Sequence, residues 1–361
     1  MRWSWLLMVV TACNSTLEPS LPSNVQPQAL AFSVAHSHTL TVDQFGVVLS
    51  HGSEVPQPTD QDGNDIPLSL PIANAVAAGK RHACALSPTG TVHCWGDNTA
   101  GALGAHRTCP PPAEGSTTAS CVLGADILPT LPPARAIAAA DDVTCAITRD
   151  DDEVVCWGTI NRVGGSRVPA LDPPTPVVLP DATPLVADRV IASLGTVCAI
   201  ARDGALWCWG DTFGTLPVRM PQTGVVDIAL GTRHSCLIDD TGLACWGDDR
   251  NAEVSGDAER ARACGDGPCD IVEPLHLPLD ATRVVVGERH TCALLGDSSV
   301  ACWGSNEVGQ LGRKDAFLVG GIGTTVIGVT ELGAGFAHTC AQRSDGDVWC
   351  WGSTSYLDTE E

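Results

Sequence analysis

Basic residues are scarce in this chain of 361 residues. Lysine and arginine together number 20 against 42 aspartates and glutamates, which gives a formal net charge of −22. A nucleic-acid interface needs a basic stripe on one face, and the sequence shows none. The composition therefore argues against a nucleic-acid partner. The acidic surface would also repel an anionic membrane, so that only a lipid anchor would attach the chain to one.

Long helical patterns and long hydrophobic runs are also missing. No extended segment repeats its apolar residues with a period of about 3.6 positions, which argues against a helical fold. The N-terminal apolar stretch Trp3–Val10 is too short to cross a bilayer. We therefore expect an all-β chain without a transmembrane anchor.

Motifs of catalysis are absent as well. No serine nucleophile elbow, phosphate-binding loop or metalloprotease helix occurs. The acidic clusters Asp150–Glu153 and Asp239–Asp240 fall in predicted turns, where we interpret them as solvated turn residues. Asp60–Asp65 resembles the opening of a calcium loop, but Asp65 stands where that loop has glycine and Pro71 where it has its bidentate glutamate. We predict no catalytic, cofactor or metal site, and calcium near Asp60–Asp65 stays open as an alternative.

Cysteine and tryptophan, by contrast, form a repeated pattern. Six times a cysteine is followed, after a short segment, by Cys-Trp-Gly. The copies are Cys84 with Cys94-Trp95, Cys145 with Cys156-Trp157, Cys198 with Cys208-Trp209, Cys236 with Cys245-Trp246, Cys292 with Cys302-Trp303, and Cys340 with Cys350-Trp351. A unit that recurs about every 50 residues indicates a repeat architecture.

A seventh copy precedes these six. The segment from His38 to Gly52 aligns without a gap with the segment from His82 to Gly96. Leu40 and Ser50 stand in the two cysteine positions, and His51 stands in the tryptophan position. Degenerate terminal copies are typical of repeat proteins, because end units pack against different neighbours.

Each unit predicts a hairpin of two short strands. In the second unit, Ala83–Leu86 leads through Pro88-Thr89-Gly90 into Thr91–Trp95. Further short apolar pieces flanked by prolines lie upstream of most units, and prolines suit strand ends or edge strands. These pieces are Ile66–Pro71, Pro176–Pro180, Leu216–Pro221 and Pro274–Pro278. We predict about four short strands per unit.

The cysteine count of 17 is odd, and Cys13 is the unpaired one. It follows the apolar stretch at the N-terminus, and Val10-Thr11-Ala12-Cys13 resembles a bacterial lipobox. We predict a signal peptide over residues 1–12, lipidation of Cys13, and a linker over residues 13–27. The predicted location is the bacterial cell envelope or surface; an ordinary signal peptide, and so a secreted protein, is the alternative.

The other sixteen cysteines pair by proximity into a disulfide framework, as expected of an exported chain. Six pairs join the two cysteines of each repeat, because opposed residues of antiparallel strands lie within reach of a disulfide. The two further pairs are Cys109 with Cys121 and Cys264 with Cys269. Zinc at the Cys264–Cys269 segment and six pairs of buried free thiols are the alternatives, and the signal sequence argues against free thiols.

The full repeat resembles the regulator of chromosome condensation repeat. The two best copies run from Gly79 and His82 through Trp95-Gly96 to Leu103-Gly104, and from Gly287 and His290 to Leu311-Gly312. The resemblance implies a seven-bladed β-propeller over residues 28–361, each blade a four-stranded antiparallel sheet. The third copy departs from the pattern at Ala140 and Val143, and the fourth lacks the Gly-x-x-His spacing.

The repeated residues then receive structural roles. The six tryptophans, Trp95, Trp157, Trp209, Trp246, Trp303 and Trp351, are expected to fill the space between neighbouring blades. Trp207 and Trp349 are expected to pack there too, rather than to form a sugar-binding platform. We interpret the repeated histidines as core hydrogen-bonding residues. Leu21–Gln28 or Ser353–Leu357 is expected to close the ring by pairing with the opposite end of the chain.

The long segments between hairpins are the candidates for binding. They are Ala105–Leu128, Thr159–Pro176, Asp248–Glu273 and Arg313–Thr325, and propeller loops of this kind commonly build binding sites. We predict a monomeric, non-enzymatic lipoprotein that binds a protein or a glycan through loops on one face. The alternatives are guanine-nucleotide exchange or regulation, as in eukaryotic family members and disfavoured by export, or an enzyme that uses the central pocket.

Overall fold

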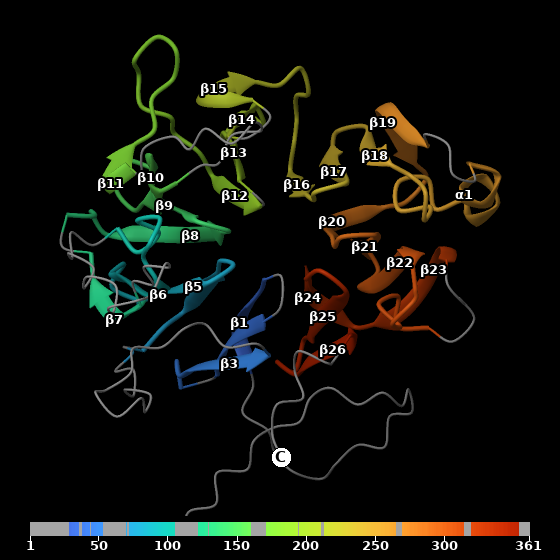
Figure 1. Cartoon of the computed structure of the whole chain (residues 1–361), viewed down its shortest axis with the longest axis horizontal. Helices are drawn as coiled ribbons and strands as arrows, with labels where there is room; N and C mark the ends of the chain where they lie inside the picture. Colours follow the sequence, from blue (N-terminus) through green and yellow to red (C-terminus); the bar gives the residue numbers. More distant parts are fainter. Residues whose placement is uncertain are drawn as a thin grey trace, which may run out of the picture.

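Seven antiparallel sheets stand around a central axis, and the chain passes through them in order (Figure 1). This computed structural model describes residues 29–35, 38–43, 45–52, 70, 72–104, 122–128, 130–159, 171–193, 195–210, 213–264, 269–313 and 319–353. The all-β, seven-bladed propeller predicted from the repeat is confirmed.

The first strand of each blade lies nearest the axis, and the later strands follow outward. Blade 1 holds β1 (Ala29–Val34), β2 (His38–Asp43) and β3 (Val48–Gly52); blade 2 holds β4 (Ala75–Ala78), β5 (His82–Leu86), β6 (Val92–Asp97) and β7 (Val122–Ile127); blade 3 holds β8 (Ala134–Ala140), β9 (Val143–Thr148), β10 (Val154–Gly158) and β11 (Leu171–Pro176); blade 4 holds β12 (Arg189–Ser193), β13 (Thr196–Ile200), β14 (Leu206–Gly210) and β15 (Gly214–Arg219). Blade 5 holds β16 (Asp227–Leu230), β17 (His234–Asp239), β18 (Gly242–Asp248) and β19 (Asp270–Leu277); blade 6 holds β20 (Ala281–Val286), β21 (His290–Leu295), β22 (Ser299–Ser305) and β23 (Val319–Ile327); blade 7 holds β24 (Val329–Ala334), β25 (His338–Arg343) and β26 (Val348–Gly352).

Blades 2 to 6 have four strands, and the described parts of blades 1 and 7 have three. The proline-flanked pieces that enter the described strands belong to β11, β15 and β19, which are outer edge strands, as predicted. A bulge interrupts the pairing of the third and fourth strands at each tryptophan of these blades. An edge strand tolerates both prolines and bulges, because its outer side carries no ladder.

Blades 1 and 7 lie side by side, so the ring closes between the two ends of the described chain (Figure 1). A Cβ added to Gly333 of β24 would come within 2.7 Å of Val34 Cγ2 and 2.8 Å of Phe32 Cε2 of β1. This close approach needs glycine. Of the ring-closing segments predicted at Leu21–Gln28 and Ser353–Leu357, only Ser353 is described, and its N–H donates to the carbonyl of Ala337 in the same blade at 2.8 Å. Pairing of these segments with the opposite end of the chain stays a prediction.

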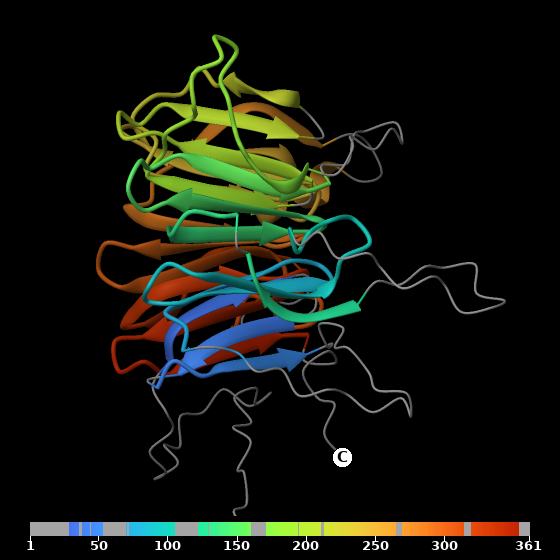
Figure 2. The same cartoon turned by 90° about the vertical axis from the view of Figure 1, so that its left-hand side faces the viewer.

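The strand order places the long connections on one face of the ring. In blades 2 to 6 the first strand turns into the second, and the third into the fourth, at the same end, and blades 1 and 7 turn from first to second strand at that end too. All four predicted binding segments leave from this end, because they follow β6, β10, β18 and β22. We name it the insertion face, and we name the other end, which carries the turns between second and third strands, the turn face. Figure 2 views the ring from its edge, with a face at either side.

One helix interrupts the all-β pattern and was not predicted. Helix α1 (Ala258–Cys264) lies in the connection between β18 and β19. Asp257 caps it, because its Oδ1 accepts hydrogen bonds from the backbone N–H groups of Glu259 at 2.9 Å and Arg260 at 3.1 Å. At seven residues the helix is too short for the period of its side chains to have indicated it.

Candidate functional site

Disulfides join the second and third strands of six blades. The bonded pairs are Cys84–Cys94, Cys145–Cys156, Cys198–Cys208, Cys236–Cys245, Cys292–Cys302 and Cys340–Cys350. Cys269 is also disulfide-bonded and is buried. Cys13, Cys109, Cys121 and the side chain of Cys264 lie outside the described part of the structure, so their predicted roles stay predictions.

Five of the six disulfides pack against the tryptophan of the next blade. Cys84 and Cys94 share a buried cluster with Trp157, and the same relation joins Cys145 and Cys156 to Trp209. Later blades repeat it with Trp246, Trp303 and Trp351. In blade 1, Leu40 stands in a cysteine position and packs in the cluster of Trp95. An apolar contact thus replaces the disulfide where the first repeat has lost its cysteines.

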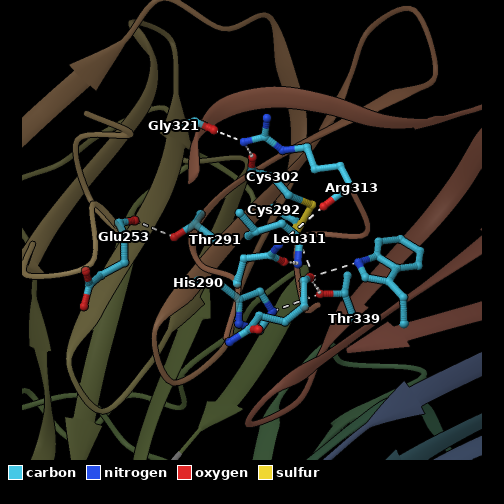
Figure 3. The surroundings of a disulfide bond; sticks show 12 residues. Glu253, His290, Thr291, Cys292, Cys302, Leu311, Arg313, Gly321 and Thr339 are labelled. Atoms are coloured by element: carbon cyan, nitrogen blue, oxygen red, sulfur yellow. Dashed lines mark hydrogen bonds between the residues drawn. A yellow bond between two sulfur atoms is a disulfide. The ribbon is translucent and has the colours of Figure 1, made fainter. Parts of the chain in front are cut away.

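A hydrogen-bonded unit spans the junction of blades 6 and 7 (Figure 3). Thr339 Oγ1 donates to the carbonyl oxygen of Gln310 at 3.0 Å, and Trp351 Nε1–H donates to the same oxygen at 2.9 Å. Since the threonine proton is used in this way, Oγ1 accepts from His290 Nε2–H at 2.9 Å. We name this set, a histidine and a loop carbonyl of one blade with a threonine and a tryptophan of the next, the inter-blade clamp.

Two other junctions carry the same clamp. Between blades 2 and 3, His82 lies 2.8 Å from Thr144 Oγ1, and the carbonyl of Ala102 accepts from Thr144 and Trp157. Between blades 5 and 6, His234 Nε2 lies 2.7 Å from Thr291 Oγ1, and the carbonyl of Glu253 accepts from Thr291 and Trp303. The histidines are therefore buried structural residues, in agreement with our interpretation of the sequence.

A side-chain oxygen four residues before each clamp carbonyl holds that peptide group in place, because it accepts a hydrogen bond from the N–H of the same peptide group. Asn98 Oδ1 accepts from Leu103 N–H at 2.9 Å, and Asn306 Oδ1 accepts from Leu311 N–H at 2.9 Å. In blade 5, Asp249 Oδ1 accepts from Val254 N–H at 3.0 Å and so takes the asparagine's place. Sequence reasoning missed both the asparagine's role and the threonine of the clamp. Their signal was the recurrence of threonine directly after the histidine position.

The glycine three residues before His82, His290 and His338 makes room for the imidazole ring. A Cβ at Gly79, Gly287 or Gly335 would lie 2.1–2.2 Å from the Cε1 atom of His82, His290 or His338, respectively. Blade 3 lacks both residues, and its Val143 packs in one apolar cluster with Val197 of blade 4. The two departures of the third copy from the repeat are thus coupled. Val143 replaces the histidine, so no imidazole needs the space that glycine would leave, and Ala140 can replace the glycine.

The clamp is incomplete where blade 1 meets blade 2. His38 is buried, and its Nε2 has no hydrogen-bond partner among the described residues. In the other clamps a threonine of the next blade accepts this bond, but the corresponding residue of blade 2 is Ala83. An unsatisfied buried donor costs about 1–3 kcal/mol. A hydroxyl at position 83 would therefore supply the acceptor that His38 lacks at this junction.

The insertion face holds a cavity of about 340 Å³ at the axis. Its lining comes from all seven blades, at the ends of the first strands and in the turns that follow them. Most of these residues are alanine, glycine, valine or leucine. The larger or polar ones are Lys80, Asp141, Ser193, Thr232, Glu288 and Phe336. The clamp histidines are not among the lining residues, so they do not gather into a catalytic group at the axis.

An ion-pair network joins the cavity to the connection between β18 and β19. Glu288 accepts a hydrogen bond from Thr232 Oγ1 and lies 3.8 Å from Arg233 NH1. Arg233 also pairs with the buried Asp248 at 2.8 Å. Asp249, fully buried, pairs with Arg260 at 3.0 Å. The acidic residues of this segment thus hold the loop's shape, and in the described ranges no three potential ligands gather to hold a metal.

Burial shifts the pKa values of the clamp's titratable residues in opposite directions. Desolvation lowers the pKa of His38, His82 and His234 to about 4 and that of His290 to about 3. Desolvation also raises the pKa of the Glu253 carboxyl to about 7, although Asn251 donates hydrogen bonds to it. The histidines are therefore neutral at pH 7, and Glu253 titrates near neutrality.

On the turn face, most aspartates cap turns. Asp239 and Asp297, for example, accept hydrogen bonds from the N–H groups two residues later. Asp152 differs from the solvated residue that we expected, because Arg135 and Arg202 both pair with it and lower its pKa. The predicted calcium loop at 60–65 lies outside the described residues.

The two extra tryptophans differ in their packing. Trp207 packs against the core cluster between blades 3 and 4, as expected. Trp349 does not share this burial: it is 39% exposed, and the guanidinium of Arg343 lies 5.3 Å from its ring centroid. Blade 7 shows no fourth strand among the described residues, so this ring on its outer strand stays accessible.

The fold and its junctions define the class: a seven-bladed propeller whose blades are stapled by disulfides. The model of the regulator of chromosome condensation (RCC1) repeat matches residues 74–102, 281–310 and 329–356. These three segments therefore carry RCC1 repeats, and the seven-bladed fold is similar to that of RCC1 structures. None of the helices in the described ranges is long and apolar enough to cross a membrane.

Known relatives share this fold at low sequence identity. Protein pim1 of Schizosaccharomyces pombe is 28% identical over 275 residues, which are 66% of this chain and 48% of pim1. The chain thus spans about half the length of this relative. Human WBSCR16 superimposes with a TM-score of 0.67 at 16% identity, covering 89% of this chain and 88% of that one. Yeast RCC1 (Prp20), solved with Kap60 bound, gives 0.62 at 21% identity, covering 78% and 70%.

The orphaned histidine yields a stability prediction. Ala83→Thr places a hydroxyl where Thr144, Thr291 and Thr339 accept from their histidines, so we expect it to satisfy His38. Ala83→Val is the matched control, because it adds the same volume without the hydroxyl. The threonine variant should be more stable than the valine variant by about 1 kcal/mol in equilibrium urea unfolding. Equal stabilities would contradict the role assigned to the clamp.

The opposed pKa shifts predict a pH dependence. The lowered histidine pKa values stabilise the folded state above pH 6.5, and this contribution is lost as the pH falls toward 4. Glu253 opposes this loss, because its raised pKa favours the folded state below pH 4.5 and ceases to do so as the pH rises through about 7. Glu253→Gln should therefore lose more stability than wild type between pH 7 and pH 5, measured by urea unfolding. Parallel losses would rule out a buried, titrating Glu253.

Proposed function

We propose that this chain is an exported, non-enzymatic scaffold that binds a protein partner through its insertion face. The observation that carries the proposal is that all four long connections leave the sheets at that face, which also holds the central cavity. Binding residues are commonly carried by loops that a rigid frame positions. Here the frame is the ring of disulfides and inter-blade clamps directly beneath those loops.

Relatives of the same fold support protein binding in general terms. Yeast RCC1 was solved with Kap60 bound, and a second study of Prp20p describes its binding to Gsp1p and histones. These partners belong to those proteins. The net charge of −22 argues against nucleic acid for this chain, and export argues against exchange of guanine nucleotides on an intracellular partner.

Attachment to the cell envelope through a lipid on Cys13 is part of the proposal. It is supported by the lipobox-like sequence and by the buried disulfides, which require an oxidising compartment. Mass spectrometry of the mature N-terminal peptide tests it. Diacylglycerol on Cys13 is the expected result, and a mature N-terminus without lipid contradicts the anchor.

A matched pair of variants tests the binding face. Val308 and Arg262 are exposed on the insertion face, and Val226 and Arg219 are exposed toward the turn face. Val308→Asp with Arg262→Glu should abolish capture of a specific protein from envelope extracts, because it reverses charge and removes apolar contact area there. Val226→Asp with Arg219→Glu makes the same changes on the other face and should leave capture intact. Identical captured sets for both variants would contradict the proposal.

A further inference from the structure

The central cavity has the size and lining of a small-molecule site. Its volume of about 340 Å³ lies at the lower end of the range of ligand pockets, about 300–1,000 Å³. Most of its lining residues are apolar, and they come from the innermost strands and the turns after them. The apolar wall residues include Val34, Ala78, Ala139, Ala192, Leu230 and Val286. Ligand sites typically combine such walls with a few placed polar groups.

One cationic side chain, that of Lys80, lines this cavity. Lys80 is one of only two lysines in the sequence, the other being Lys314, although the chain has 20 basic residues. Its side chain is exposed, and its ammonium makes no hydrogen bond or ion pair with the described residues. An ammonium on a flexible stem can adapt its reach to a bound anion. Although the chain has a net charge of −22, this ammonium at the cavity has no acidic partner among the described residues. Lys80 is therefore available to pair with the carboxylate of a bound ligand.

Two carboxylate residues line the same cavity, Asp141 on blade 3 and Glu288 on blade 6. Blade 6 contributes Glu288, and blade 5 contributes Thr232, whose hydroxyl donates to Glu288 Oε2. Arg233 lies no nearer than 3.8 Å to Glu288 Oε1. A carboxylate offers about four acceptor positions, so Glu288 retains capacity for a further donor. Blade 2, which carries Lys80, lies across the axis from blades 5 and 6 (Figure 1).

We propose that the central cavity binds a small zwitterion with an apolar side chain, of the class of free aliphatic amino acids. The ligand's carboxylate pairs with Lys80, its ammonium donates to Glu288, and its side chain packs on the alanine and valine walls. A ligand with only a carboxylate would leave Glu288 facing an apolar group. A ligand with only an amine would leave Lys80 without an anionic partner. This site is independent of the protein-binding function proposed above.

Three compounds with one branched alkyl chain test the ligand class. They are L-leucine, 3-methylbutylamine, which lacks the carboxylate, and 4-methylpentanoate, which lacks the amine. Calorimetric titration of the full mature chain, with its disulfides intact, should show binding of leucine at least about tenfold tighter than of either analogue. Equal affinity for leucine and 4-methylpentanoate, or no heat with any compound, would overturn the proposal.

Two variants and an internal control locate the site. Lys80→Met should weaken leucine binding about tenfold without changing binding of the amine, and Glu288→Gln should weaken both leucine and the amine. Leucine should also slow acetylation of Lys80 by acetic anhydride, followed by mass spectrometry, while Lys314 in the same molecule reacts at an unchanged rate. Leucine binding that survives both substitutions would overturn the assignment. Because protein capture is a separate readout, failure here and failure of the proposed function are distinguishable.

Discussion

The propeller depends on one carbonyl group at each clamped junction. An oxygen in the connection after the third strand accepts hydrogen bonds from the threonine and the tryptophan of the next blade, as the Gln310 carbonyl does for Thr339 and Trp351. A buried carbonyl needs hydrogen-bond donors. Because the donors of this carbonyl belong to the next blade, its hydrogen bonds also hold the two sheets together. The disulfide lies directly beneath, so one short region combines a covalent bond, an aromatic contact and a hydrogen-bond network.

This arrangement also positions the candidate site. The connection that supplies the clamp carbonyl is the one that extends over the insertion face, and in blade 5 it carries Asp249 and Glu253. Arg233 then joins that segment to Glu288 at the central cavity. Residues that hold the blades together are therefore neighbours in sequence of residues on the insertion face. The insertions begin at positions that the clamps hold in place.

Much of the fold could be predicted from the sequence, because the same repeat occurs seven times. Cys84 and Cys94 recur with a spacing that only a hairpin satisfies, and Leu40 marks the seventh copy despite its lost cysteines. The partners of the histidines could not be predicted in the same way. Thr144 and Thr339 lie in the next blade, so no local spacing relates them to His82 and His290. A central pocket was anticipated, but its lining residues could not be, since they come from seven separate turns of ordinary composition.

The central claim is that six of the seven blades are each closed by their own disulfide, formed, as we propose, outside the reducing cytoplasm. Peptide mapping under non-reducing conditions, on protein taken from its own cells and alkylated at once, tests this most directly. The account predicts six linked pairs, each within one repeat, from Cys84–Cys94 to Cys340–Cys350. Alkylated thiols at these positions, or links between different blades, would contradict it.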